Sequence, residues 1–135
     1  MRQKAFAYLA LVFALFMGIE PAMAHHSFAA EFDSTKQVVK RGFVTKVEWT
    51  NPHVWFYINV KDEATGKVTN WGFEMGPPHG LQTRGWTRET MKLGDEVIVN
   101  GSLAKNGSPR VNARTVTVAK TGKAMGAASS EGNTP

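Results

Sequence analysis

Apolar and polar residues alternate along most of the chain between residues 37 and 118, with the period of two that is typical of β-strands. Five such runs are separated by turn residues and, between the third and the fourth, by a longer connection. Each run is long enough for one strand of a small sheet. The predicted strands are residues 37–49, 53–60, 68–75, 96–103 and 110–118.

The alternation also predicts which side chains face the core. Four large apolar residues of the first run fall on one parity and are expected to point inward: Val39, Phe43, Val47 and Trp49. Gly42, in the middle of this run, is expected to mark a bulge or a sharp coil, which a closed sheet needs. The inward faces predicted for the next three runs are Val54, Phe56, Ile58, Val60, then Trp71, Phe73, Met75, then Val97, Val99, Leu103.

The connections between the runs suggest the fold. Residues 62–67 and 105–109, the latter with Asn-Gly, are typical of hairpin turns. Residues 76–93 are expected to hold one or two short helical segments, with Thr87 and Thr90 as candidate N-caps. We therefore predict a mainly β fold, a five-stranded OB-like partly open barrel with a short helical connection between strands 3 and 4. A six-stranded sandwich and an open meander are the alternatives.

Both ends of the chain are predicted to lie outside the barrel. Residues 1–24 combine basic residues, an apolar run and an A-x-A site at 22–24, the pattern of a cleaved secretory signal peptide. A membrane anchor is the alternative, but the apolar run is shorter than the roughly 20 residues of a bilayer span. The expected organisation is then an N-terminal arm at 25–35, the barrel domain at 36–119 and a disordered tail at 120–135.

Composition indicates the cellular compartment of the protein and excludes one class of binding partner. The chain has no cysteine, and its formal net charge of +5 is spread along the sequence rather than gathered in one stripe. Nucleic acid is therefore not expected as a partner. An export signal without disulfides predicts a periplasmic domain that is held together by its apolar core and that meets the membrane only during export. Nothing in the sequence indicates an oligomeric state.

Histidines and one methionine are the candidate metal ligands. Cleavage after residue 24 would make His25 the N-terminal residue, whose amine and ring nitrogen can chelate one metal ion. His26 adds an imidazole, and His53, at the start of the second strand, would complete a nitrogen-rich set that suits copper(II). His79 and Met75 flank a Gly-Pro-Pro turn and form a softer pair that suits copper(I). Copper is the favoured ligand. The alternatives without a specific metal site are that His25 and His26 form a mobile terminal tip and that Met75 belongs to the apolar core.

Aromatic residues on the second strand support a different, metal-free hypothesis. Their outward face corresponds to the surface that OB-folds use for ligands. A small organic ligand, a glycan or a protein partner in the envelope would bind there. Alternatively, the N-terminal arm covers this face, with Phe28 and Phe32 packed on its rings. The candidate ligand-binding residues are Trp55, Tyr57, Asn59 and Trp86.

Enzymatic chemistry is not indicated. Glu48 and Glu74 are candidate general bases, but the sequence pairs neither of them with a nucleophile. Ser27 and Ser102 lack the signature of a nucleophile elbow. The chain is therefore predicted to be an exported, non-enzymatic binding protein.

Several segments are distinctive as a set: HHSFAAEFD at residues 25–33, WTNPH at 49–53 and RGWTR at 84–88. With their neighbouring segments they cover nearly all of the chain after residue 24. They resemble a family of small exported bacterial proteins of unknown function. The resemblance implies an exported, β-rich, OB-like module in which a His-His pair directly follows the signal, as His25 and His26 do here. It implies no catalytic residues.

Overall fold

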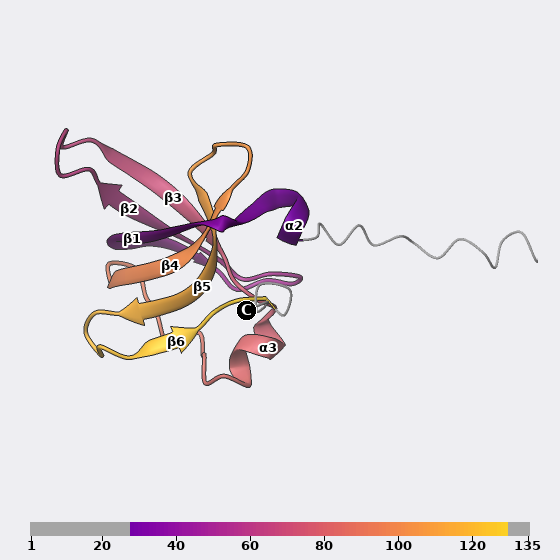
Figure 1. Cartoon of the computed structure of the whole chain (residues 1–135). Coiled ribbons are helices and arrows are strands. Elements are labelled where there is room, and N and C mark those ends of the chain that lie inside the picture. The colour runs from indigo at the N-terminus through magenta and orange to yellow at the C-terminus, as the bar shows by residue number, and fades with distance from the viewer. Residues whose placement is uncertain (1–27, 130–135) are drawn as a thin grey trace, which may run out of the picture.

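The computed structural model describes residues 28–129 (Figure 1). The predicted mainly β architecture is confirmed, since the two helices within this described range have only four and five residues. No helix within residues 28–129 has the length and apolar character to cross a bilayer. In chain order the elements are α2 (Phe28–Glu31), β1 (Phe32–Glu48), β2 (Trp55–Lys61), β3 (Val68–Glu74), α3 (Pro78–Gln82), β4 (Glu96–Ala104), β5 (Arg110–Val118) and β6 (Ala124–Gly126).

Hydrogen bonds join five of these strands into a ring. β1 pairs antiparallel with both β2 and β4, β2 pairs with β3, and β4 pairs with β5. A short parallel pairing between β3 and β5 closes the ring. The helix α3 lies in the connection from β3 to β4. This order of strands confirms the OB-like barrel.

β1 is long enough to serve two neighbours. Its first part pairs with β4 and its last part with β2, and Phe43 is paired with both Asn59 and Glu96 at the exchange. Gly42 permits the bend, because a Cβ there would lie 2.1 Å from the carbonyl oxygen of Asn59. The β-bulge in the β1–β2 ladder follows Val44, two residues after the glycine at which it was expected.

The bulge exchanges the two faces of β1. Before it, Val39 and Phe43 are 64% and 56% exposed, so the prediction that they point inward is wrong. After it, Val47 and Trp49 pack partly buried against the core, as predicted. The physical reason is the single extra residue, Thr45, because a shift by one residue turns every following side chain to the other face.

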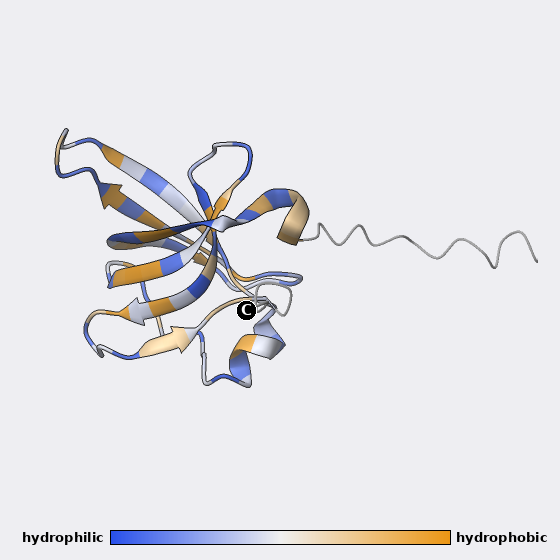
Figure 2. Cartoon of the chain, in the orientation of Figure 1, coloured by the Kyte–Doolittle hydropathy of each residue, from blue (hydrophilic) through white to orange (hydrophobic). Residues whose placement is uncertain are grey.

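Apolar side chains fill the interior of the barrel. The rings of Phe56 and Phe73 stack near its centre, with their centroids 5.0 Å apart. Hydrophobic and hydrophilic residues alternate along the strands in Figure 2, in agreement with the inward faces predicted for β2, β3 and β4. Burying each such side chain contributes about 1.5–3 kcal/mol. The fully buried members include Val54, Phe56, Ile58, Phe73, Met75, Val97, Val99, Val111 and Val116.

The chain continues to pack on the barrel after β5. β6 pairs with β5, the indole Nε1 of Trp86 donates to the carbonyl oxygen of Gly126 over 2.8 Å, and Ala127 is fully buried. The prediction of a disordered tail is therefore wrong for residues 120–129. Small residues without an apolar period can still be held when their backbone groups find hydrogen-bond partners. Residues 130–135 lie outside the described part of the chain.

Two further boundaries differ from expectation. β1 begins at Phe32, inside the arm predicted for residues 25–35, because this phenylalanine is buried and paired with β4. Thr87 and Thr90 cap no helix; they form a turn in which the Thr90 hydroxyl accepts a hydrogen bond from the Thr87 backbone N–H over 2.8 Å. The predicted signal peptide falls within residues 1–27, outside the described residues.

Replacing Gly42 by alanine is expected to lower the free energy of unfolding by about 2 kcal/mol, because the new methyl group meets backbone atoms of β2. Gly80→Ala is the matched control. Its Cβ would lie 3.5 Å from Pro77 Cγ, and alanine is favoured over glycine in a helix. Urea denaturation followed by circular dichroism measures both variants. Equal stabilities of the two variants would contradict this account of the bend.

Candidate functional site

A groove of about 450 Å³ lies on the outer face of β2 and β3, where this face meets the hairpin between β4 and β5. We call it the aromatic groove. The end of β1 and the start of β5 form its walls, so residues from four strands and one turn meet there. The residues that matter below are Glu48, Trp55, Tyr57, Gly72, Ser108 and Arg110.

Gly72 shapes the floor of the aromatic groove. A Cβ at this position would lie 3.2 Å from Tyr57 Cε1 and 3.8 Å from Trp55 Cζ3, so both rings lie over the glycine. Trp55 and Tyr57 are two residues apart on β2 and therefore project from the same face. Both are half-buried. The missing side chain at Gly72 creates the space in which the two rings stand.

Charged groups border both rings. The guanidinium carbon of Arg110 is 4.7 Å from the ring centroid of Trp55, and Lys46 Nζ is 5.5 Å from that of Tyr57. The Tyr57 hydroxyl donates to the carboxylate of Glu48 over 3.2 Å, and Lys46 forms an ion pair with the same carboxylate. The hydrogen bond from Lys46 holds the pKa of Glu48 below its usual value, whereas burial raises the pKa of Tyr57. The groove thus combines stacking surfaces with fixed polar groups.

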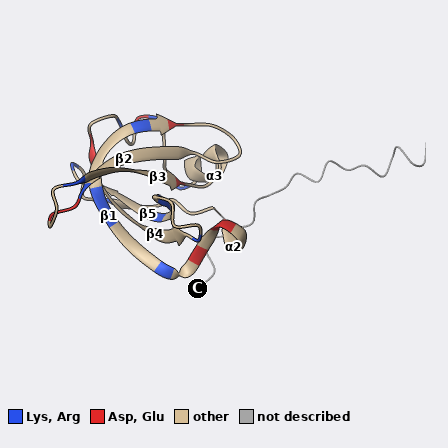
Figure 3. Ribbon diagram, turned by 90° about the horizontal axis from the view of Figure 1, so that it is seen from above, with Lys and Arg blue, Asp and Glu red and all other residues tan. Residues whose placement is uncertain are grey.

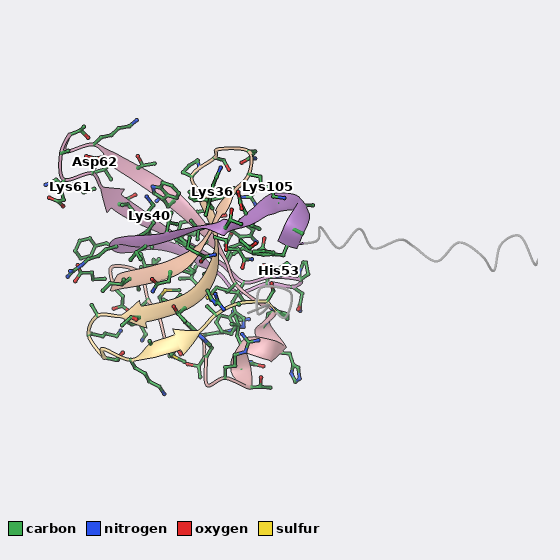
Figure 4. All side chains as sticks on the ribbon, in the orientation of Figure 1. Lys36, Lys40, His53, Lys61, Asp62 and Lys105 are labelled. Carbon is green, nitrogen blue, oxygen red and sulfur yellow. The ribbon has the colours of Figure 1, made fainter. Side chains whose placement is uncertain are left out.

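A titratable pair lies next to the aromatic groove. Glu74 Oε1 is 3.8 Å from His53 Nδ1 and accepts a hydrogen bond from Asn112 Nδ2 over 3.2 Å. The Glu74 side chain is 13% exposed, and this burial raises the pKa of its carboxyl group; His53 opposes the effect and Glu31 adds to it. Glu31 belongs to α2, so α2 lies near the pair, and Figure 4 shows His53 on the same side of the barrel as α2.

The ring of His53 has a defined orientation. Its Nδ1 lies 3.0 Å from the carbonyl oxygen of Met75. A carbonyl oxygen only accepts, so Nδ1 carries the proton and the Nε2 of the neutral ring keeps its lone pair. Metal-ligating histidines are commonly fixed in this way by a backbone carbonyl. The other two predicted nitrogen ligands, His25 and His26, lie outside the described residues.

The predicted copper(I) pair occupies two different environments. The side chain of Met75 is completely buried in the barrel core, whereas His79 is exposed on α3. The thioether therefore packs among apolar side chains, in agreement with the alternative that Met75 is a core residue. Within residues 28–129, no three His, Cys, Asp or Glu side chains are grouped so as to hold a metal ion.

The four predicted ligand-binding residues separate in the structure. Trp55 and Tyr57 line the aromatic groove. Asn59 lies one step further along β2 and reaches the groove only through Asn70, whose Nδ2 donates to it over 2.8 Å. Trp86 is 1% exposed and belongs to the core, so its prediction as a ligand-binding residue is wrong. Its indole N–H is satisfied by the backbone of the C-terminal segment, a partner that the sequence pattern does not reveal.

Sequence reasoning missed Gly72 and Arg110. They lie on strands far apart in the chain and become direct partners in the parallel pairing of β3 with β5. The backbone N–H of Gly72 also donates to the carbonyl oxygen of Pro109 over 3.0 Å, which draws the hairpin against the groove. A glycine inside a predicted strand is the one available signal, because it often marks a close approach of a ligand or another backbone.

The described part of the N-terminal arm, residues 28–35, does not line the aromatic groove. The rings of Phe28 and Phe32 stack on each other, with centroids 5.9 Å apart, and Phe32 is buried against β4. The backbone N–H of Lys105 donates to the carbonyl oxygen of Glu31 over 2.9 Å. The arm thus lies against the β4–β5 hairpin, and the alternative in which Phe28 and Phe32 cover the groove does not hold for the described residues.

The described chain is thus a small OB-like barrel with an aromatic groove beside its closing strands. It belongs to a family of unknown function, DUF6152, whose model matches residues 14–113. This match covers the barrel from α2 into β5 and confirms the resemblance to a family of unknown function. Comparison with curated proteins and with solved structures gives no match.

The buried Glu74 predicts a pH dependence of stability. The pKa of its carboxyl group is higher in the folded protein than in the unfolded chain. Between these two pKa values the folded state binds more protons than the unfolded state, so the free energy of unfolding falls as the pH rises through this range. Glu74→Gln removes this titration. The free energy of unfolding of the wild type, minus that of the variant, is therefore expected to be larger near pH 4 than near pH 7.

Urea denaturation at both pH values measures this difference. Repeating the pair of proteins in a His53→Gln background removes the neighbouring imidazole. A difference that is constant with pH, or that is larger near pH 7, would show that burial does not control this carboxyl group.

Proposed function

We propose that this protein is a non-enzymatic binding module that holds a small, ring-containing organic ligand in the aromatic groove. The observation that carries the proposal is the placement of two aromatic rings, Trp55 and Tyr57, side by side over Gly72 on an open strand face. A groove of about 450 Å³ falls within the range of small-molecule sites, roughly 300–1,000 Å³.

The chemistry of the groove suits stacking together with directed hydrogen bonds. Trp55 and Tyr57 offer ring faces to a sugar or an aromatic ring, and Glu48 offers a carboxylate at the edge. The hydroxyl of Ser108 is turned into its own hairpin, where it donates to Asn106 Oδ1 over 2.7 Å. This arrangement supports binding rather than nucleophilic catalysis.

The protein is proposed to bind its ligand outside the cytoplasm. Residues 1–24 have the pattern of a secretory signal peptide, and the chain has no cysteine. An exported domain without disulfides depends on its apolar core, which the closed barrel supplies. Glycans and small aromatic molecules of the periplasm are the ligand classes that fit both this address and the groove.

Trp55→Leu is expected to weaken ligand binding about tenfold, because a stacked aromatic pair contributes about 1 kcal/mol and its apolar burial adds to this. Trp71→Leu is the matched control. Trp71 is also half-buried beneath a cation, Lys40 Nζ at 4.1 Å, but it lines a different groove. In Figure 4, Lys40 lies at the opposite side of the barrel from His53.

The ligand is sought by tryptophan fluorescence against neutral and acidic saccharides and aromatic acids, and the first hit is confirmed by calorimetry. Binding that is unaffected by Trp55→Leu, or that is equally reduced by Trp71→Leu, would contradict the placement of the site in the aromatic groove.

A second candidate function is copper binding through His25, His26 and His53. One observation favours it: the Met75 carbonyl oxygen holds Nδ1 of the His53 ring, which leaves Nε2 for a ligand. The side chain of His53 is 29% exposed, so an ion can reach it. Imidazole and amine nitrogens suit copper(II), which also heads the affinity order of the divalent metals.

The position of α2 is compatible with this second candidate. Glu31 of α2 is close enough to raise the pKa of Glu74, the carboxyl group beside His53. Phe28, the first residue of α2, follows His25 by three residues, and three extended residues span at most about 11 Å. The chain length between α2 and the proposed new N-terminus is thus short.

For the copper site, protein that begins at His25 is expected to bind Cu(II) more tightly than protein with one extra residue ahead of it. The extension removes the chelating amine, and a weakening of about 10–100-fold is the scale on which an altered ligand environment changes metal affinity. His53→Ala is expected to weaken binding as well, whereas His79→Ala, at an exposed position on α3, is the control.

Competition titration measures the affinities, and electron paramagnetic resonance reports the nitrogen ligands. Affinities that change neither with the extension nor with His53→Ala would exclude this copper site.

A further inference from the structure

Arg110 occupies a junction between two hollows. It lines the aromatic groove and also a smaller hollow of about 250 Å³ between α2 and the β4–β5 hairpin, which we call the side hollow. The side hollow is bordered by Glu31 on α2 and by Lys105 on the hairpin. A group held at Arg110 can therefore belong to a molecule whose ring lies on Trp55.

The hydrogen-bonding capacity of Arg110 is unmet among residues 28–129. Its guanidinium group stacks on Trp55, with the carbon atom 4.7 Å from the ring centroid, and it has no hydrogen bond or ion pair to any described residue. Arg41, by contrast, donates from Nε to Glu96 over 2.7 Å. Stacking fixes the plane of the guanidinium group and leaves its N–H donors at the edge, in the fork that matches a carboxylate.

Two of the carboxylates near Arg110, those of Glu48 and Glu74, already have other partners. Glu48 is in an ion pair with Lys46. Glu74 accepts a hydrogen bond from Asn112 and lies beside His53, and burial raises the pKa of its carboxyl group. The guanidinium group of Arg110 forms no hydrogen bond or ion pair with either carboxylate, so its N–H donors remain for a ligand.

The charged residues that border the side hollow determine how much negative charge a ligand can carry there. Two cations, Arg110 and Lys105, border the side hollow, against one carboxylate, Glu31. Lys105 Nζ also donates to the carbonyl oxygen of Ala29, which holds it at this border. A singly charged carboxylate suits this surplus better than a dianionic phosphate, which Glu31 and Glu74 would repel more strongly.

We infer that the ligand of the aromatic groove carries a carboxylate, which Arg110 binds while the attached ring stacks on Trp55 and Tyr57. The inference rests on the proposed function of the groove and adds the ligand class, an acidic sugar or an aromatic acid. Arg110 is then the residue that determines specificity, because a neutral ligand would cover its N–H donors without pairing them.

The test uses the chain from His25 and two probes that differ only in the carboxylate, phenyl β-D-glucuronide and phenyl β-D-glucoside. The wild type is expected to bind the glucuronide about tenfold more tightly, as expected for a charge-assisted pair. Arg110→Gln is expected to bind both probes equally, and Arg110→Lys to recover part of the preference. Arg114→Gln, at an exposed position on the same strand and outside the groove, is expected to keep it.

Calorimetry gives the affinities, and circular dichroism confirms that each variant is folded. Equal binding of the two probes to the wild type would overturn the carboxylate inference and leave the proposed function standing. A preference that persists in Arg110→Gln would also overturn it, because another cation would then recognise the acid. Binding of neither probe to the wild type would overturn it as well, and the wider ligand screen with Trp55→Leu would then decide the proposed function alone.

Discussion

The parallel pairing of β3 with β5 is the interaction on which the rest of the structure depends. It consists of three residue pairs, yet it converts a sheet into a ring. It places Gly72 beside Arg110 and Glu74 beside Asn112, so the same contact that encloses the core also assembles the aromatic groove and its titratable neighbour. Parallel strands need a crossover rather than a hairpin, which is why the chain passes through α3 and β4 before β5 returns to β3.

The chemistry of the site is local rather than a property of the whole surface. Residues of both charges are distributed over the barrel in Figure 3, in keeping with a net charge of +5 that forms no stripe. What distinguishes the groove is the placement of a few groups: two rings over a glycine and a stacked guanidinium, with the mostly buried carboxyl group of Glu74 beside them. The positive charge of Arg110, which borders the groove, also lowers the pKa of Glu74, so protonation of Glu74 and ligand binding would act on each other through charge.

Much of the fold could be predicted from the sequence, because alternation and turn residues act over short distances. The five strands of the ring, their order and both hairpins follow from such signals. The inward face of the first half of β1 could not be predicted, since one unpaired residue, Thr45, exchanges the faces without leaving a compositional mark. The C-terminal segment was also missed, because backbone hydrogen bonds rather than apolar side chains hold much of it. In the site, Trp55 and Tyr57 were predicted from their parity, whereas Arg110 enters only through tertiary closure, which no local pattern encodes.

Amide hydrogen exchange at Gly72, measured by nuclear magnetic resonance, tests most directly whether barrel closure builds the groove. The backbone N–H of Gly72 faces β5 and donates to the carbonyl oxygen of Pro109 over 3.0 Å. If closure builds the groove, this amide is protected as strongly as those of the core strands and exchanges only when the whole barrel unfolds. The contradicting result is exchange of this amide at the rate of an unstructured peptide while the amides that hydrogen-bond β1 to β2 stay protected. The ring would then be open between β3 and β5, and the groove would lose its structural basis.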